Sequence, residues 1–228
     1  MKKNKVLKIG VFGFGYWGPN LVRNFHYNEK CCVKTIVDLN EARLAVAQKL
    51  YPHVQISKSP DDLYKDPEID AVVVALPVGY HFEFAQKALL NDKHVLIEKP
   101  MTNSKAQALE LIELAQKKRK ILMVDHTFLY TGAVAKIKEI ITSGEIGEVQ
   151  YFDSIRINLG LFQHDVSVIW DLAPHDLSII EYLIEERASS VAVTGISHTS
   201  NNIENIAYMT LYFKSNKIAH FNLSWTSP

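Results

Sequence analysis

The sequence contains only two cysteines among its 228 residues, which is too few for a disulfide-stabilised scaffold. Cys31 and Cys32 are adjacent, and neighbouring side chains in an extended segment point to opposite faces. We therefore expect no bridge between them and interpret both as buried thiols of a reducing compartment.

The sequence also lacks an excess of charge, because 25 basic residues balance 25 acidic residues. No bulk field attracts nucleic acid or an anionic membrane. No apolar run approaches the roughly 18 residues of a membrane span. The N-terminal apolar run is too short and too rich in glycine for a signal peptide. We expect no nucleic-acid partner, no membrane segment and no metal site, and a cytoplasmic location.

Near its start, the sequence has an apolar run that breaks into glycines. Residues 6–18 read VLKIGVFGFGYWG, and Gly13, Gly15 and Gly18 have the G-x-G-x-x-G spacing of dinucleotide-binding turns. Gly13 would make the tight turn, Gly15 would let a pyrophosphate approach the backbone, and Gly18 would let the next helix lie close to the strand. The helix N-terminus would offer N–H groups to the phosphates.

An acidic residue follows at the spacing that this motif requires. Asp38 lies twenty residues after Gly18, at the end of the apolar run 31–37, where it could accept hydrogen bonds from ribose hydroxyls. Because its charge would repel a 2′-phosphate, the sequence favours NAD. Arg43 lies five residues further on, where it could reach a 2′-phosphate, so NADP stays an alternative cofactor. The alternative is a doubly wound domain that binds nothing at this turn.

Strand and helix patterns alternate through the first half of the chain. We expect a parallel sheet with helices on both faces, and the fully apolar segment 69–76 is typical of a strand buried on both faces. The expected strands are 7–12, 31–37, 54–57, 69–76, 94–97 and 121–124, and the expected helices are 16–28, 41–50, 79–91 and 104–120.

The pattern changes after residue 125. We expect a helix that ends at Gly144, a helix over 174–184 with Pro174 near its start, and strands over 149–159, 190–197, 206–213 and 218–225. Consecutive strands with few crossovers favour a mostly antiparallel sheet. We therefore predict a doubly wound dinucleotide-binding domain over 1–125 and an α+β domain over 126–228.

Two further sites carry groups suited to chemistry. Glu98-Lys99-Pro100 follows a strand, and ligands of open α/β sheets bind beyond the carboxyl ends of strands, so Lys99 could reach the reactive end of a cofactor. The alternative is a solvated loop lysine. Asp171 and His175 are four residues apart, on one face of a helical turn. They could be a base and its partner, or equally a helix cap and a core histidine.

Together, Gly13-Phe-Gly15-Tyr-Trp-Gly18, Glu98-Lys99-Pro100 and Asp171-Leu-Ala-Pro-His175-Asp176 resemble the Gfo/Idh/MocA oxidoreductases. The resemblance covers the whole chain. It implies a Rossmann domain over 1–125 and an α+β domain over 126–228 with an open, mostly antiparallel sheet that is incomplete at its C-terminal end. It also implies hydride transfer between a sugar or polyol carbon and nicotinamide. It implies that Lys99 orients or polarises the reacting hydroxyl, that His175 takes its proton, and that Asp171 helps to hold the substrate. The chemistry needs such groups, since a hydride leaves a carbonyl only if the hydroxyl proton also departs.

The resemblance also implies a set of residues that line the cofactor. These are Gly13, Phe14, Gly15, Tyr16, Trp17, Gly18, Asp38, Leu76, Pro77, His81, Glu98 and Lys99.

Longer runs indicate a subgroup of the family. Residues 15–25, 126–130 and 170–178 look like nucleotide-sugar members similar to UDP-N-acetylglucosamine 3-dehydrogenases. This likeness places His126, Arg156 and Asn158 as candidate contacts to sugar or diphosphate, although buried structural polar residues are an equal alternative. A polyol or free-sugar dehydrogenase, and a non-catalytic dinucleotide-binding protein, also stay open.

The chain departs from the family pattern in two ways. Pro174 stands where many relatives have a small or β-branched residue, and family chains run on beyond the end of this sequence. The resemblance further implies a homo-oligomer formed through the sheet of the second domain.

Overall fold

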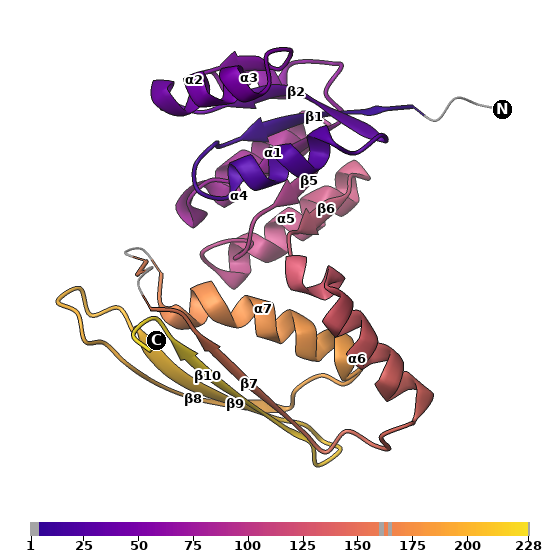
Figure 1. Cartoon of the computed structure of the whole chain (residues 1–228), viewed down its shortest axis with the longest axis vertical. Helices are drawn as coiled ribbons and strands as arrows, with labels where there is room; N and C mark the ends of the chain where they lie inside the picture. Colours follow the sequence, from indigo (N-terminus) through magenta and orange to yellow (C-terminus); the bar gives the residue numbers. More distant parts are fainter. Residues whose placement is uncertain (1–4, 160–161, 164–165, 228) are drawn as a thin grey trace. The chain divides into compact units, whose positions relative to one another are not determined.

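The computed structural model describes residues 5–159, 162–163 and 166–227. The chain divides into two compact units, residues 1–125 and residues 126–228, whose helices and strands are drawn in Figure 1. The first unit is an α/β unit and the second is an α+β unit.

The first unit contains a six-stranded sheet in the order β3-β2-β1-β4-β5-β6. Every pairing in this sheet is parallel, so the prediction of a doubly wound parallel sheet is confirmed. The strands are β1 (Leu7–Phe12), β2 (Cys31–Val37), β3 (Gln55–Ser57), β4 (Ala71–Val74), β5 (His94–Ile97) and β6 (Leu122–Val124).

Alternate residues of a strand point to opposite faces of the sheet. Because apolar side chains lie on both faces, helices cover both. Phe12 packs into a core with Leu89 and Leu111, whereas its neighbour Val11 packs into a second core with Leu21 and Val22. The helices are α1 (Gly18–His26), α2 (Glu41–Leu50), α3 (Asp61–Tyr64), α4 (Val78–Leu90) and α5 (Lys105–Lys118).

Several details of the first unit differ from expectation. β4 covers only residues 71–74 of the expected 69–76, and α1 covers residues 18–26 of the expected 16–28. The short helix α3 was not expected; a single turn of four residues is too short to produce a helical period. Cys32 is exposed rather than buried. It is the second residue of β2, and continuous burial in that strand begins only beyond it.

The second unit contains a four-stranded sheet in the order β7-β10-β9-β8. β10 pairs antiparallel with β9 and parallel with β7, and β8 pairs antiparallel with β9, so the sheet is mixed and mostly antiparallel. The strands are β7 (Tyr151–Ile157), β8 (Ser190–Ile196), β9 (Ile206–Tyr212) and β10 (Ile218–Ser224). The core side chains of β10, Ala219, Phe221 and Leu223, are fully buried.

Helix α7 (Val168–Leu183) packs against this sheet and begins earlier than expected. The Ser167 side chain accepts a hydrogen bond from the Trp170 N–H at its N-terminus. Pro174 lies inside the helix, where a proline costs about 3 kcal/mol. Val168, Ala173 and Ile180 are buried in the core, and we attribute the tolerance of Pro174 to this packing. The unit also contains α6 (Gly132–Ser143) and a 3-10 turn, η1 (Thr127–Tyr130).

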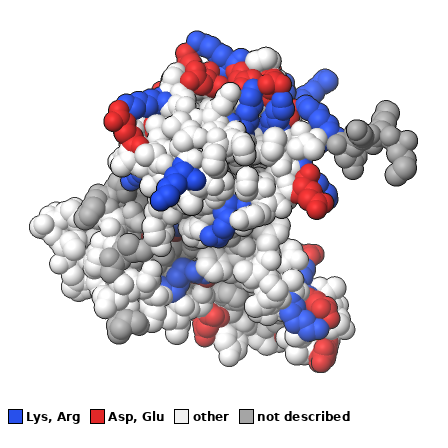
Figure 2. Space-filling view, turned by 45° about the horizontal axis from the view of Figure 1, so that its top comes forward, with Lys and Arg blue, Asp and Glu red and all other residues white. Residues whose placement is uncertain are grey.

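Charges of both signs are mixed on the surface shown in Figure 2. Several belong to ion pairs, such as Lys65 with Asp61 at 2.6 Å and Lys34 with Asp66 at 2.5 Å. Within the described residues, no helix is long and apolar enough to cross a membrane.

The hydroxyl of Tyr64 gives a prediction about stability. Tyr64 is 5% exposed, and its ring packs 5.1 Å from that of Phe12, but its buried hydroxyl has no hydrogen-bond partner among the residues that the structure describes. Removing an unsatisfied buried group avoids its desolvation penalty, so Tyr64→Phe should raise the free energy of unfolding by about 1 kcal/mol. Denaturant unfolding measures this, with the exposed Tyr27→Phe as control. A loss of stability would contradict the unsatisfied state of this hydroxyl.

Candidate functional site

The turn between β1 and α1 is closed by backbone contacts that only glycine permits. Gly13 has a φ of +94°, and a Cβ on it would lie 2.3 Å from the carbonyl oxygen of Ala75, at the end of β4. A Cβ on Gly18 would lie 2.2 Å from the carbonyl oxygen of Gly13. The first and third glycines therefore pack the turn against β4 and the helix start against the turn.

Asp38 holds the same turn from the end of β2. Its Oδ2 accepts the Phe14 N–H at 2.7 Å, and its Oδ1 accepts the Asn40 N–H at 2.8 Å. The guanidinium of Arg43 lies 3.7 Å from Oδ2, and a Cβ on Gly15 would lie 3.3 Å from the same Nη1. The predicted ribose acceptor is thus also the residue that fixes the glycine turn, and Arg43 reaches the open side of Gly15.

The N-terminus of α1 is suited to an anion. Its first turn contains no acidic residue, and Pro19 lies at the first positions, where the missing N–H of proline costs nothing. The Asn20 N–H already donates to the Trp17 carbonyl at 2.9 Å, so it is the positive end of the helix dipole that favours negative charge here. Tyr16 is exposed and Trp17 is partly exposed beside this turn.

A buried histidine joins two further segments of the predicted cofactor edge. His81, on α4, is 1% exposed. Its Nε2 lies 2.7 Å from the carbonyl oxygen of Leu76, and its Nδ1 lies 2.9 Å from that of Pro100. Pro77, which follows Leu76, precedes the first residue of α4.

The loop after β5 places the carboxyl group of Glu98 beside Lys99. The Lys99 N–H donates to Glu98 Oε2 at 3.2 Å. Burial and the neighbouring Asp125 raise the pKa of Glu98 to about 8. Lys99 itself is half-buried, and the Lys99–Pro100 peptide bond is cis.

In the second unit, α7 carries both Asp171 and His175. Because they are four residues apart, they lie on one face of the helix. Trp225, which is 2% exposed just beyond β10, donates its indole N–H to Asp171 Oδ2 at 3.2 Å. The position of Asp171 is thereby tied to the central strand of the sheet.

His175 is in contact with a second cluster that starts from Arg156 on β7. Arg156 forms a bidentate ion pair with the buried Asp176, with both hydrogen bonds at 2.8 Å. Its guanidinium lies 4.5 Å from the ring centre of Phe128, and that ring lies edge-on to His175 at 4.8 Å. Arg156, proposed from sequence as a substrate contact, therefore also supports the aromatic neighbour of His175.

The other two substrate candidates lie at the edges of this cluster. His126 is half-buried and precedes η1, which carries Phe128. Asn158 is exposed after β7, and its N–H donates to the Ser224 carbonyl at 2.9 Å.

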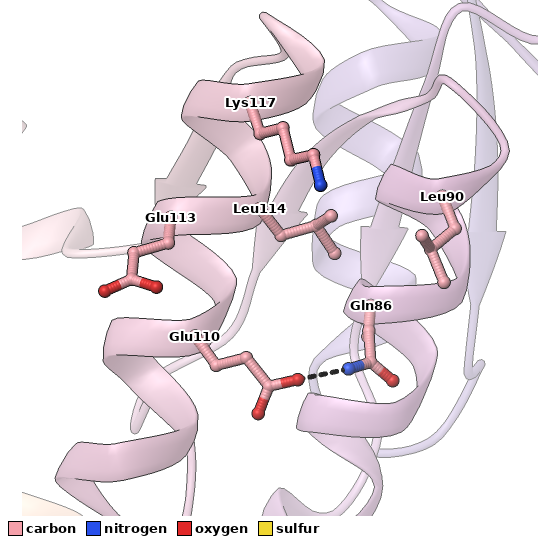
Figure 3. Close-up of a pocket in the computed structure, with 6 residues that line it drawn as sticks. All are labelled: Gln86, Leu90, Glu110, Glu113, Leu114 and Lys117. Carbon is pink, nitrogen blue, oxygen red and sulfur yellow. Dashed lines mark hydrogen bonds between the residues drawn. The ribbon is translucent and has the colours of Figure 1, made fainter.

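A hollow of about 340 Å³ lies between α4 and α5, as Figure 3 shows. Gln86 donates to Glu110 at 2.6 Å across it. None of the predicted site residues lines it, so we assign it no function. The lining residues are Gln86, Leu90, Glu110, Glu113, Leu114 and Lys117.

Each of the two units matches a model of a known protein family. Residues 7–126 match the model described as "Oxidoreductase family, NAD-binding Rossmann fold". Residues 134–228 match the GFO/IDH/MocA C-terminal domain. The chain belongs to the Gfo/Idh/MocA oxidoreductase family. The resemblance inferred from the motifs is confirmed, and so is NAD as the cofactor.

The names of similar curated proteins refer to different substrates. A dTDP-3,4-didehydro-2,6-dideoxy-alpha-D-glucose 3-reductase from Saccharopolyspora spinosa is 42% identical over 41% of this chain and 28% of its own. A myo-inositol 2-dehydrogenase from Thermotoga maritima is 26% identical over 83% of this chain and 58% of its own. The chain spans less than two thirds of the length of these curated relatives.

A solved structure shows the same fold. GenD2 from gentamicin A biosynthesis, in complex with NAD, has a TM-score of 0.92 and 19% identity, covering 98% of this chain and 67% of its own.

The geometry of the glycine turn fits a dinucleotide. The first and third glycines leave no room for a side chain, and the acid-free start of α1 faces the same turn. Sequence reasoning missed the supporting residues Phe128, Asp176 and Trp225. Two of them stand inside or beside quoted motifs, but nothing in the sequence marks Trp225 as a partner of Asp171.

The contact of Gly18 with the turn gives a prediction about cofactor binding. Gly18→Ala should weaken NAD binding at least tenfold, because its Cβ would push α1 away from the carbonyl of Gly13. Gly132→Ala is the control, since a Cβ there meets nothing within 4 Å. Titration calorimetry measures both affinities. Equal affinity for NAD in the two variants would show that the helix start does not position the cofactor.

Proposed function

We propose that this protein is an NAD-dependent dehydrogenase that transfers a hydride between a sugar carbinol carbon and nicotinamide. We further propose a nucleotide sugar of the UDP-N-acetylglucosamine type as the substrate, reacting at its 3-position. The observation that carries this proposal is the pair Asp171 and His175 on one face of α7. It adds acid–base groups to a chain whose first unit is a dinucleotide fold.

Each proposed catalytic residue has a task that its chemistry suits. Bound NAD accepts or supplies the hydride at its nicotinamide ring. The ammonium of Lys99 would stabilise the developing alkoxide, and the imidazole of His175 would take the hydroxyl proton. Asp171, held by the indole N–H of Trp225, would fix the substrate on the same helix face as His175.

The first unit supplies the proposed cofactor contacts. Gly13, Gly15 and Gly18 would hold the pyrophosphate at the start of α1, with Phe14, Tyr16 and Trp17 around it. Asp38 would accept from the adenosine ribose, since its carboxylate can take further hydrogen bonds beyond Phe14 and Asn40. Leu76, Pro77, His81, Glu98 and Lys99 would line the nicotinamide end.

The nucleotide-sugar assignment is supported by the name of the Saccharopolyspora relative, which is a dTDP-sugar 3-reductase. The second candidate is a polyol or free-sugar dehydrogenase, supported by the name of the Thermotoga relative, a myo-inositol 2-dehydrogenase. The two candidates differ in one requirement. Only the first needs a nucleoside diphosphate for the sugar to bind.

The first test is calorimetric titration of the chain with NAD, followed by UDP-N-acetylglucosamine, while absorbance at the NADH band is recorded. We expect both to bind and reduced cofactor to appear. Reduction with free myo-inositol but not with the nucleotide sugar would favour the second candidate. Binding of NAD without reduction by either substrate would contradict catalysis and leave a dinucleotide-binding protein.

A variant of the proposed base separates catalysis from folding. His175→Ala should lower turnover by about 10² to 10⁴, because general base catalysis contributes this much. Its affinity for NAD should stay near that of the parent. The exposed His53→Ala serves as control. If His175→Ala lost NAD binding or unfolded, His175 would be a structural residue instead.

We also propose that the second unit forms a homo-oligomer through the outer face of its sheet. On β7, β9 and β10, alternate residues point away from α7, and six large apolar side chains on this face are exposed. They are Tyr151, Ile155, Ile157, Tyr208, Tyr212 and Ile218. They form two apolar bands on either side of the polar row Asp153, His220 and Thr210. Exposed apolar bands of this kind mark an interaction surface, and a second copy presents the same face.

This surface predicts a concentration-dependent assembly. Ile155→Lys should shift the chain toward the monomer, because a charge would be buried in the contact. Light scattering coupled to size-exclusion chromatography measures the mass, with the exposed Ile146→Lys as control. A monomeric parent chain would contradict the proposal.

A further inference from the structure

Two carboxyl groups meet at the carboxyl end of the parallel sheet. β5 and β6 are neighbours in register, with Ile97 opposite Val124. The Asp125 N–H donates to the Ile97 carbonyl at 2.8 Å. The residue that follows each of these strands is acidic, Glu98 after β5 and Asp125 after β6. Because the two strands are in register, Glu98 and Asp125 lie side by side at this edge.

These carboxyl groups need a proton between them. Asp125 is 8% exposed, and the two side chains are within hydrogen-bonding reach. Glu98 Oε1 and Asp125 Oδ2 are both buried, and among the described residues neither receives a hydrogen bond from a donor. Ionised carboxylates only accept, so two of them cannot satisfy each other, whereas one shared proton satisfies both.

Among the described residues, Lys99 is the charged group that favours the ionised form of the pair. Lys99 follows Glu98, favours its ionised form and donates its backbone N–H to Glu98 Oε2. From α4, the imidazole of His81 binds the carbonyl of Pro100 in the same loop. Burial and Asp125 outweigh Lys99, so the pKa of Glu98 rises to about 8. Near neutral pH, Glu98 therefore keeps its proton beside Asp125.

We propose that Glu98 and Asp125 release their shared proton when NAD⁺ binds, so that rising pH makes this site prefer NAD⁺ over NADH. The proposal rests on the proposed function, in which the nicotinamide end lies beside Lys99. The oxidised ring carries a positive charge that the reduced ring lacks, while the rest of the two molecules is the same. A positive charge favours the ionised form of a carboxyl pair. Asp125 would thus help to set the preference of the site for NAD⁺ over NADH.

The direction of the pH dependence follows from the thermodynamic linkage between NAD⁺ binding and proton release. Below the pKa of the free pair, NAD⁺ binds with proton release, so its affinity rises with pH by up to about tenfold per pH unit. Above that pKa the free pair is already ionised, and the affinity becomes constant. NADH binds without proton release, so its affinity should change little over the same range.

Calorimetry of the full chain tests this directly. NAD⁺ and NADH are each titrated at pH 7 in buffers of different ionisation enthalpy, and the slope of observed enthalpy against buffer enthalpy counts the protons. We expect release of about half to one proton with NAD⁺ and almost none with NADH. The dissociation constant of NAD⁺ should fall about fivefold or more between pH 6.5 and pH 8.

Isosteric variants assign the proton. Asp125→Asn provides an amide donor to Glu98 and should abolish both the proton release and the pH dependence. Glu98→Gln should do the same and covers the case in which Asp125→Asn does not fold. Asp92→Asn is the matched control. Asp92 is an exposed residue that precedes β5 at its amino end and pairs with Lys118 at 3.3 Å.

The outcomes are distinguishable. Binding of NAD⁺ by the parent chain without proton release overturns the inference and leaves the proposed function intact. Proton release that persists in both Asp125→Asn and Glu98→Gln assigns the proton to another group, such as Lys99, and also overturns it. Failure of the parent chain to bind either cofactor form overturns the proposed function together with the inference.

Discussion

The first unit depends on the close approach of backbone segments at the glycine turn. A Cβ atom on Gly13 would lie 2.3 Å from the carbonyl oxygen of Ala75, and one on Gly18 would lie 2.2 Å from that of Gly13, which is too close for any side chain. Because nothing intervenes, the ends of β1 and β4 meet the start of α1, and the Phe14 N–H reaches Asp38. The cofactor edge is therefore shaped by main-chain packing before any side chain contacts a ligand.

Local patterns predicted the elements around this turn well. β1, β2, α2 and β5 begin and end at the expected residues, because each apolar pattern is bounded by glycine, polar or capping residues. Helix α7 did not follow its local pattern. Pro174 indicates a helix start, but α7 begins at Val168, since the buried face of the helix packs on a sheet formed by residues distant in the sequence.

The side-chain pairings of the candidate site could not be predicted from local sequence patterns. Arg156 meets Asp176 across 20 residues of sequence, and Trp225 meets Asp171 across 54. Both contacts depend on how β7 and β10 lie against α7, which no local period specifies. Glu98 and Asp125 differ, because each follows a predicted strand. Their adjacency needed only the strand order, yet sequence analysis treats Asp125 as no more than a domain boundary.

The strand order of the second unit also bears on how the chain folds during synthesis. β7 pairs only with β10 among the described strands, and β10 lies between β7 and β9. A ribosome delivers β7, α7, β8 and β9 before β10 exists, so β7 must wait with an open edge. The first unit, whose sheet is complete by residue 124, can fold during this delay. The nascent chain would thus acquire its dinucleotide fold before its proposed proton acceptor is in place.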